Sequence, residues 1–354
     1  MSFVPEDLRA AVAAGIIDEA QAARLKALAD DRTGRRSAMP AEDEPFEFFR
    51  GFSEIFISIG LIILLSGVAA LLVAFGGFAL LTMVPLACAG IAWWWATYFT
   101  LRRRMTLPSM VLACAYGAGV AIFGFTVLDK GGLDAKAIAI LGFAVSAAAM
   151  ALWYRQFRLP FSAFLTGAFV LGMVYAVTAS AANLGGLATN GDFRSFFDLR
   201  TNPAFAMATL LFGIGAFLVG MWFDTRDPHR LGRHAATAFW CHLLAAPALV
   251  NTVAVTLMNG SGLGLMALAL VAITVLALVI DRRSFLTAAI AYIAIIISWV
   301  MGDQGGTQWI FVLLLLGSFI TAIGTWWVQL RGWVMRVLPD FPGKSRLPPY
   351  GSTE

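Results

Sequence analysis

The chain has few charged residues: Asp, Glu, Lys and Arg make up 13% of its 354 residues, whereas about 25% is usual in a soluble domain. Hydrophobic residues make up 60% of it, and the mean hydropathy is +0.80. This composition excludes a soluble globular protein. We expect an all-α polytopic membrane protein whose main partner is the lipid bilayer, and no nucleic-acid partner.

Cysteine is also scarce. The three cysteines, Cys88, Cys114 and Cys241, lie inside apolar stretches and lack the spacing of metal ligands. A disulfide framework and a zinc site are therefore not expected, and the three thiols should be small core residues. We expect neither a metal ion nor a cofactor.

The first 50 residues lack a basic segment followed by an apolar run, so we expect no cleavable signal peptide. The first span should then act as its own insertion signal. A crossing needs about 20 apolar residues. Hydropathy predicts ten such segments, at 53–75, 77–99, 107–128, 135–153, 160–182, 203–223, 235–257, 262–280, 285–301 and 307–330.

Basic residues predict the orientation of these spans. All but four of the 25 Lys and Arg residues fall on one side of the ten-span arrangement. Because cytoplasmic loops retain positive charge, that side is expected to be cytoplasmic, together with both termini. The four on the other side are Lys130, Lys136, Arg194 and Arg200.

Tryptophan prefers the headgroup level of a bilayer, so its positions test the same arrangement. Nine tryptophans fall at expected span ends, and we interpret them as interfacial anchors: Trp93, Trp94, Trp95, Trp153, Trp222, Trp326 and Trp327 on the cytoplasmic side, Trp299 and Trp309 outside.

Three expected cytoplasmic turns are similar in sequence. They begin at Arg104-Met-Thr-Leu-Pro-Ser, Arg158-Leu-Pro-Phe-Ser-Ala and Arg283-Ser-Phe-Leu-Thr-Ala. Repeated helical hairpins would produce this pattern. Convergence would also produce it, since any such turn needs Arg at the headgroups and Pro or Ser near a helix start.

Four regions follow from these patterns. Residues 1–31 predict a cytoplasmic helical hairpin in which Gly15 ends the first helix. It is too small to be stable alone, so it should pack on a cytoplasmic partner, on the membrane domain, or on a second copy in a homo-oligomer. We expect a linker and an interfacial helix at residues 32–52. The ten-helix membrane domain should comprise residues 53–330, and a cytoplasmic tail residues 331–354.

The segment Leu8-Arg-Ala-Ala-Val-Ala-Ala-Gly-Ile-Ile-Asp-Glu-Ala-Gln-Ala-Ala-Arg24, followed by a linker and an array of apolar helices, resembles a group of bacterial inner-membrane proteins that form a domain-of-unknown-function family. The step Gly15-Ile-Ile-Asp18 is the recurrent feature of that group, and Phe49-Arg-Gly-Phe-Ser-Glu-Ile-Phe-Ile-Ser-Ile-Gly60 is similar to the entry into its first span. The resemblance implies a bacterial inner-membrane location. It implies no activity.

Ionisable residues are almost missing from the spans, where each one is a functional hypothesis. Asp224 and Asp281 are expected at cytoplasmic ends. His242 is the exception, because nine residues of helix place it about 13 Å beyond Arg233. Either it is a neutral structural donor, or it lines a cavity.

In addition to His242, two further residues are candidates for lining a cavity, and one basic turn is a candidate binding site for lipid headgroups. Pro247 should kink the helix, and only such a kink would bring Asn251 into the same cavity. Arg226, Arg230 and Arg233 form a turn that could bind an anionic lipid headgroup, although positive-inside charge explains them equally well.

Ten spans with both termini inside are common among carriers, so a small-molecule permease or channel-like protein is the leading interpretation. The alternative is a non-transporting scaffold or regulator that uses the hairpin to recruit a partner. An enzyme is not expected, since no general base is found beside a nucleophile in the spans.

Overall fold

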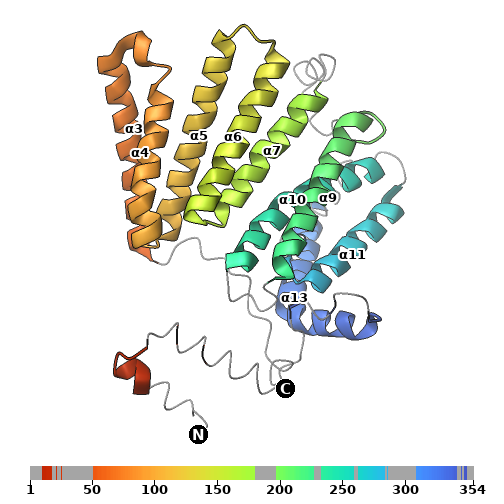
Figure 1. Ribbon diagram of the computed structural model, residues 1–354. Coiled ribbons are helices and arrows are strands. Elements are labelled where there is room, and N and C mark those ends of the chain that lie inside the picture. The colour runs from red at the N-terminus through yellow and green to blue at the C-terminus, as the bar shows by residue number, and fades with distance from the viewer. Residues whose placement is uncertain are drawn as a thin grey trace.

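A computed structural model describes residues 10–17, 21, 25, 51–179, 197–226, 233–258, 262–283, 285, 308–340, 344, 347 and 348. Every regular element in these ranges is a helix, as expected (Figure 1). The elements are α3 (Phe52–Leu80), α4 (Val84–Ala96), η2 (Thr97–Arg102), α5 (Thr106–Lys130), α6 (Ala135–Phe157), α7 (Phe161–Thr178), α9 (Pro203–Asp224), α10 (Arg233–Met258), α11 (Gly262–Ile280) and α13 (Gln308–Val337).

Six helices in the described ranges are long and apolar enough to cross a membrane. They are Phe52–Gly76 of α3, Arg233–Leu257 of α10, and the whole of α5, α6, α7 and α9. The protein is therefore a membrane-embedded helical protein. The count of ten spans stays a prediction, and its ninth segment, 285–301, lies outside the described residues except for Phe285.

The second expected segment differs from the helix that forms there. The sequence predicts a span at 77–99, but α3 continues to Leu80 and α4 begins only at Val84. Pro85 stands in the first turn of α4, where its missing N–H costs nothing and its fixed φ suits a helix start. The α-helix then passes into the wider π-helical turn η2.

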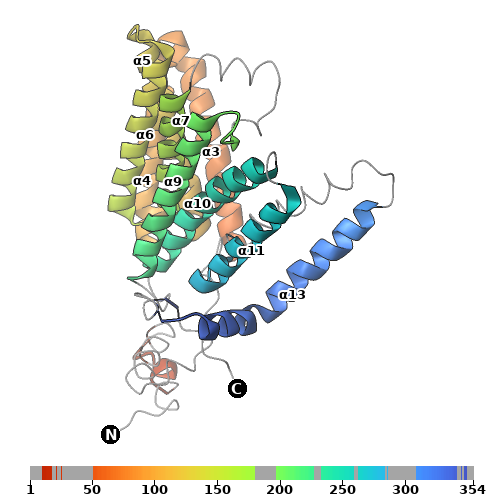
Figure 2. The ribbon, with the colours of Figure 1, turned by 90° about the vertical axis from the view of Figure 1, so that its right-hand side faces the viewer.

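The helices form two groups that meet where α9 and α10 pack on α7. Figure 1 shows α3 to α7 in a row, with α9, α10, α11 and α13 beyond α7, and Figure 2 shows α11 and α13 to the side of α10. Helix α10 also packs against α9 and α11. Helices α9 and α10 together therefore join the row to the second group.

Three described residues other than glycine have a positive φ, and all three lie in expected cytoplasmic turns: Arg104 at 52°, Arg158 at 51° and Asp281 at 56°. Two of these turns begin at the similar sequences, and the third lies two residues before Arg283. A left-handed residue after a helix turns the chain sharply so that the next helix can start. The sequences that begin at Arg104 and Arg158 therefore share a left-handed first residue, whereas the third turn has its left-handed residue earlier, at Asp281.

The first helix of the N-terminal hairpin ends at Gly15, as the sequence predicts. Gly15 has a φ of 67°, its N–H donates to Val12 O, and the N–H of Ile16 donates to Ala11 O. These two bonds and the left-handed residue form a Schellman motif. The rest of 1–31 lies outside the described residues apart from Gln21 and Leu25.

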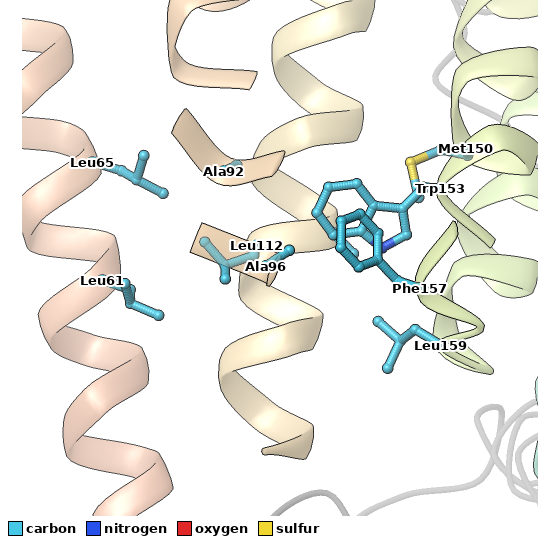
Figure 3. Packing of buried hydrophobic residues seen from close by; sticks show 10 residues of the cluster. Leu61, Leu65, Ala92, Ala96, Leu112, Met150, Trp153, Phe157 and Leu159 are labelled. Carbon is cyan, nitrogen blue, oxygen red and sulfur yellow. The ribbon is translucent and has the colours of Figure 1, made fainter. Parts of the chain in front are cut away.

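Trp153 lies at the centre of the core between α3, α4, α5 and α6, with no exposed surface (Figure 3). Its ring centroid is 4.4 Å from that of Phe157, 4.8 Å from Tyr116 and 5.6 Å from Trp93. The interpretation of Trp153 as an interfacial anchor is therefore wrong. Position along the chain predicts depth in the bilayer, but the face of the helix decides whether the side chain meets lipid or core.

Candidate functional site

His242 lies on the most enclosed of the six candidate spans. In α10, 67% of an apolar stretch of 18 residues is buried inside the protein, whereas in the other five spans at most 28% of such a stretch is buried. The His242 side chain is fully buried, and the rings of Phe217 and Phe285 lie beside it at centroid distances of 5.5 and 5.8 Å. Its surroundings are therefore protein on several sides.

The packing of α9 on α10 determines what His242 meets. A Cβ built on Gly220 would lie 2.8 Å from the His242 ring, and one built on Gly213 would lie 2.9 Å from the Leu249 side chain. These pairs set an antiparallel register in which Asp224, the last residue of α9, lies beside Ala238. Since α10 begins at Arg233, Asp224 is about 7 Å deeper than the start of α10.

Asp224 lies at the end of its span, as expected, but its side chain is buried between helices. Its carboxylate is buried, and Oδ2 lies 2.9 Å from His242 Nε2. Arg282 donates from Nε to Oδ2 at 3.2 Å and from Nη2 to Oδ1. One buried carboxylate thus joins residues from α9, α10 and the end of α11, and we call Asp224, His242 and Arg282 the buried triad.

The end of α11 brings Arg282 to this position. The N–H of Arg282 donates to Ala277 O and the N–H of Asp281 donates to Leu278 O, which with the positive φ of Asp281 forms a second Schellman motif. The chain reverses there, and Arg282 becomes fully buried, with Nη2 also donating to Ala235 O at 3.1 Å. Positive-inside charge explains why an arginine follows this span, but not why it is buried.

A second polar cluster lies next to the triad, between the end of α11 and α13. Trp327 Nε1 donates to Asp281 Oδ1 at 2.7 Å, and Arg331 Nε lies 3.7 Å from the same oxygen. Arg331 also donates to Leu278 O at 3.1 Å and to Pro348 O at 2.6 Å. Trp327 is therefore a buried donor and not an interfacial anchor, while its neighbour Trp326, which is exposed, breaks the helical dihedrals of α13.

The structure does not bring Pro247 and Asn251 to the triad. Helix α10 continues through Pro247 to Met258, Pro247 is exposed, and Asn251 is half-buried. His242 instead faces α9. A cavity shared by these three residues stays a prediction.

The basic turn lies partly outside the described residues, since Arg230 is not among them. Arg226 is exposed and lies over the Trp222 ring, 3.6 Å from its centroid, and Arg233 is exposed at the start of α10. Binding of a lipid headgroup by this turn stays a prediction.

Sequence reasoning singled out His242 but missed Asp224 as its partner, and Arg282 as the second partner of Asp224. These partners lie 18 residues before it and 40 residues after it, each at the end of another helix. The sequence could have indicated these partners only through an acidic residue and a basic residue at the ends of two spans, and such a pattern does not specify which residues pair.

No protein-family model matches the chain, and comparisons with curated proteins and with solved structures found no similar protein. The site is therefore argued from its own geometry.

Proposed function

We propose that the protein is a small-molecule permease of the bacterial inner membrane, with ten spans and both termini in the cytoplasm. The resemblance of residues 8–24 and 49–60 to a family of inner-membrane proteins supports the location, and the distribution of basic residues supports the orientation. In this proposal the second group of helices, α9 to α13, contains the path of the solute.

The observation that carries the proposal is the buried triad, in which His242 of the most enclosed span is joined to residues from two neighbouring helices. Ionisable groups inside a membrane protein are costly, and they mark pathways for ions or solutes and relays for protons. A structural role alone would be served as well by apolar side chains of similar volume, because replacing a buried ion pair in that way is often neutral or stabilising.

Proteoliposomes test the proposal directly. Metabolite profiling of a deletion strain selects candidate solutes, and stopped-flow light scattering then measures their entry into liposomes that contain the purified protein. We expect at least one solute to enter faster than it enters protein-free liposomes. The Asp224→Asn variant should slow that entry, because the amide weakens its bonds to both His242 and Arg282.

Absence of any solute flux would favour the scaffold instead. In that case a pulldown with the full chain, compared with a chain that lacks residues 1–45, should identify a cytoplasmic protein that depends on the hairpin. The proposal includes no enzymatic step and no cofactor.

A further inference from the structure

Arg282 has more donors than its protein partners accept. A guanidinium has five N–H groups. Nε donates to Asp224, and Nη2 donates to Asp224 and to Ala235 O. Among the residues that the structure describes, neither N–H of Nη1 meets an acceptor, although the side chain has no exposed surface.

A charged donor that is hidden from water and lacks an acceptor is unfavourable, so native proteins seldom retain one unless a ligand or an ordered water completes it. Arginine is also the side chain most often used to recognise anions. Two N–H groups on one buried nitrogen thus favour an anion as the missing acceptor.

The charges around the triad limit which anion can be held. Asp224 from α9 and Arg282 from the end of α11 cancel, and so do Asp281 and Arg331, which pair beside them. An added anion therefore needs one further positive charge. His242 is the group placed to supply it, because an imidazole can carry a proton and its Nε2 lies 2.9 Å from the Asp224 carboxylate, which stabilises a positive charge.

Gly220, Phe217 and Phe285 lie against the His242 ring and carry no charge. A single proton on His242 balances a single negative charge, so a dianion would leave the site with net charge.

We propose that Arg282 Nη1 binds a small monovalent anion, a halide or a carboxylate, and that a proton on His242 accompanies it. This inference rests on the proposed function for the idea that the bound pair is transported. As proton and anion together are neutral, their joint movement avoids carrying net charge through the bilayer.

The first experiment measures chloride binding to the purified full chain in detergent. The NMR signal of chloride should be broader in the presence of the protein than in the same detergent without protein. This excess linewidth should be larger at about pH 6 than at about pH 8, two values on either side of the ordinary histidine pKa. Formate is then added to the protein in chloride. If formate displaces chloride at a concentration below that of chloride, the site prefers a carboxylate, and if it displaces chloride only at a higher concentration, the site prefers a halide. No excess linewidth at either pH would overturn the proposal.

Variants connect the binding to Arg282. Arg282→Lys keeps a positive charge for Asp224, but its three donors only equal the three bonds that Arg282 makes to Asp224 and Ala235 O, so none is left for an anion. We therefore expect binding to weaken by about tenfold or more. Arg331→Lys is the matched control, since this second buried arginine of the same helix group faces the carbonyls of Leu278 and Pro348 and should leave binding unchanged. Equal binding by Arg282→Lys and the wild type would overturn the proposal.

If Arg282→Lys does not fold, His242→Gln takes its place. Glutamine can donate to Asp224 but cannot gain a proton, so chloride binding should be weak at both pH values. A chloride affinity that stays as pH-dependent as in the wild type would contradict the proposal.

Chloride flux into proteoliposomes separates this inference from the proposed function. Binding that requires Arg282, without flux of any solute, would retain the anion site and reject the permease. Flux that persists unchanged in Arg282→Lys would retain the permease and reject the anion site.

Discussion

Gly220 of α9 lies directly against the imidazole of His242 in α10: a Cβ at Gly220 would be 2.8 Å from Cε1 and 2.9 Å from Nε2. The ring is held by Asp224 on one side and packed by Phe217 on another, so it has little freedom to move. The absence of a side chain at Gly220 is thus what allows α9 to approach the triad closely.

Gly220→Ala should therefore destabilise the protein by about 1–3 kcal/mol, the usual cost of overpacking. The matched control is Gly215→Ala in the same helix, where a Cβ would meet nothing within 4 Å. We expect that variant to be neutral or slightly more stable, because alanine favours a helix over glycine. Thermal unfolding in one detergent compares them, and equal midpoints would show that the α9–α10 contact is looser than described.

Glu54 of α3 caps a neighbouring helix, since its Oε2 accepts from the N–H groups of Thr106 at 3.1 Å and Leu107 at 3.0 Å at the start of α5. Glu54→Ala should cost about 1–2 kcal/mol, as for the loss of other caps. Glu54→Gln retains an acceptor and should cost less. Amide hydrogen exchange at the start of α5 is the measurement. The same exchange rate in all three proteins would exclude the cap.

The carbonyl of Pro348 accepts from Arg331 Nη2 at 2.6 Å, and both residues are buried. A chain that ends at Asp340 should lose about 1–3 kcal/mol, the cost of leaving a buried donor without its acceptor. A chain that ends at Pro348 keeps that oxygen as a carboxylate and should be as stable as the full chain. Denaturant midpoints test the pair, and a stable shorter chain would mean that the bond contributes nothing.

His242 has no exposed surface, so a thiol placed there should be protected in the state described. In a background that lacks the three native cysteines, His242→Cys should not react with a small water-soluble thiol reagent, while Arg233→Cys at the exposed start of α10 should react. His242→Leu should cost about 1–2 kcal/mol or less, because interhelical hydrogen bonds in bilayers are modest. Rapid labelling at position 242 without added solute would instead indicate a hydrated cavity.

The ten-span topology predicts the side of each loop. Reporter fusions after Arg104, Arg158, Arg230 and Arg283 should report the cytoplasm, and fusions near Lys130, Asp198 and Asp303 the external side. One reversed pair of neighbouring loops would exclude the count of ten.

Hydropathy predicted the helical class, the membrane location and helix bounds that mostly agree within a few residues. For example, the segment expected at 203–223 is the helix Pro203–Asp224. This success has a simple reason: each window of about 20 residues must satisfy its own backbone hydrogen bonds and match the bilayer, so the information is local. The break between α3 and α4 was expected at residue 76 but lies at 81–83, because both sides of it are apolar and only Pro85 marks the new start.

The sequence by itself also identified His242, since depth along a helix follows from counting residues. Only the tertiary structure decided that Asp224 meets both His242 and Arg282, and that Trp153 and Trp327 are buried and not at the lipid interface. Those outcomes depend on the rotation of each helix about its axis and on the register between neighbours. Both are set by side-chain packing between segments far apart in the chain, such as Gly220 against His242, which no local pattern of hydropathy contains.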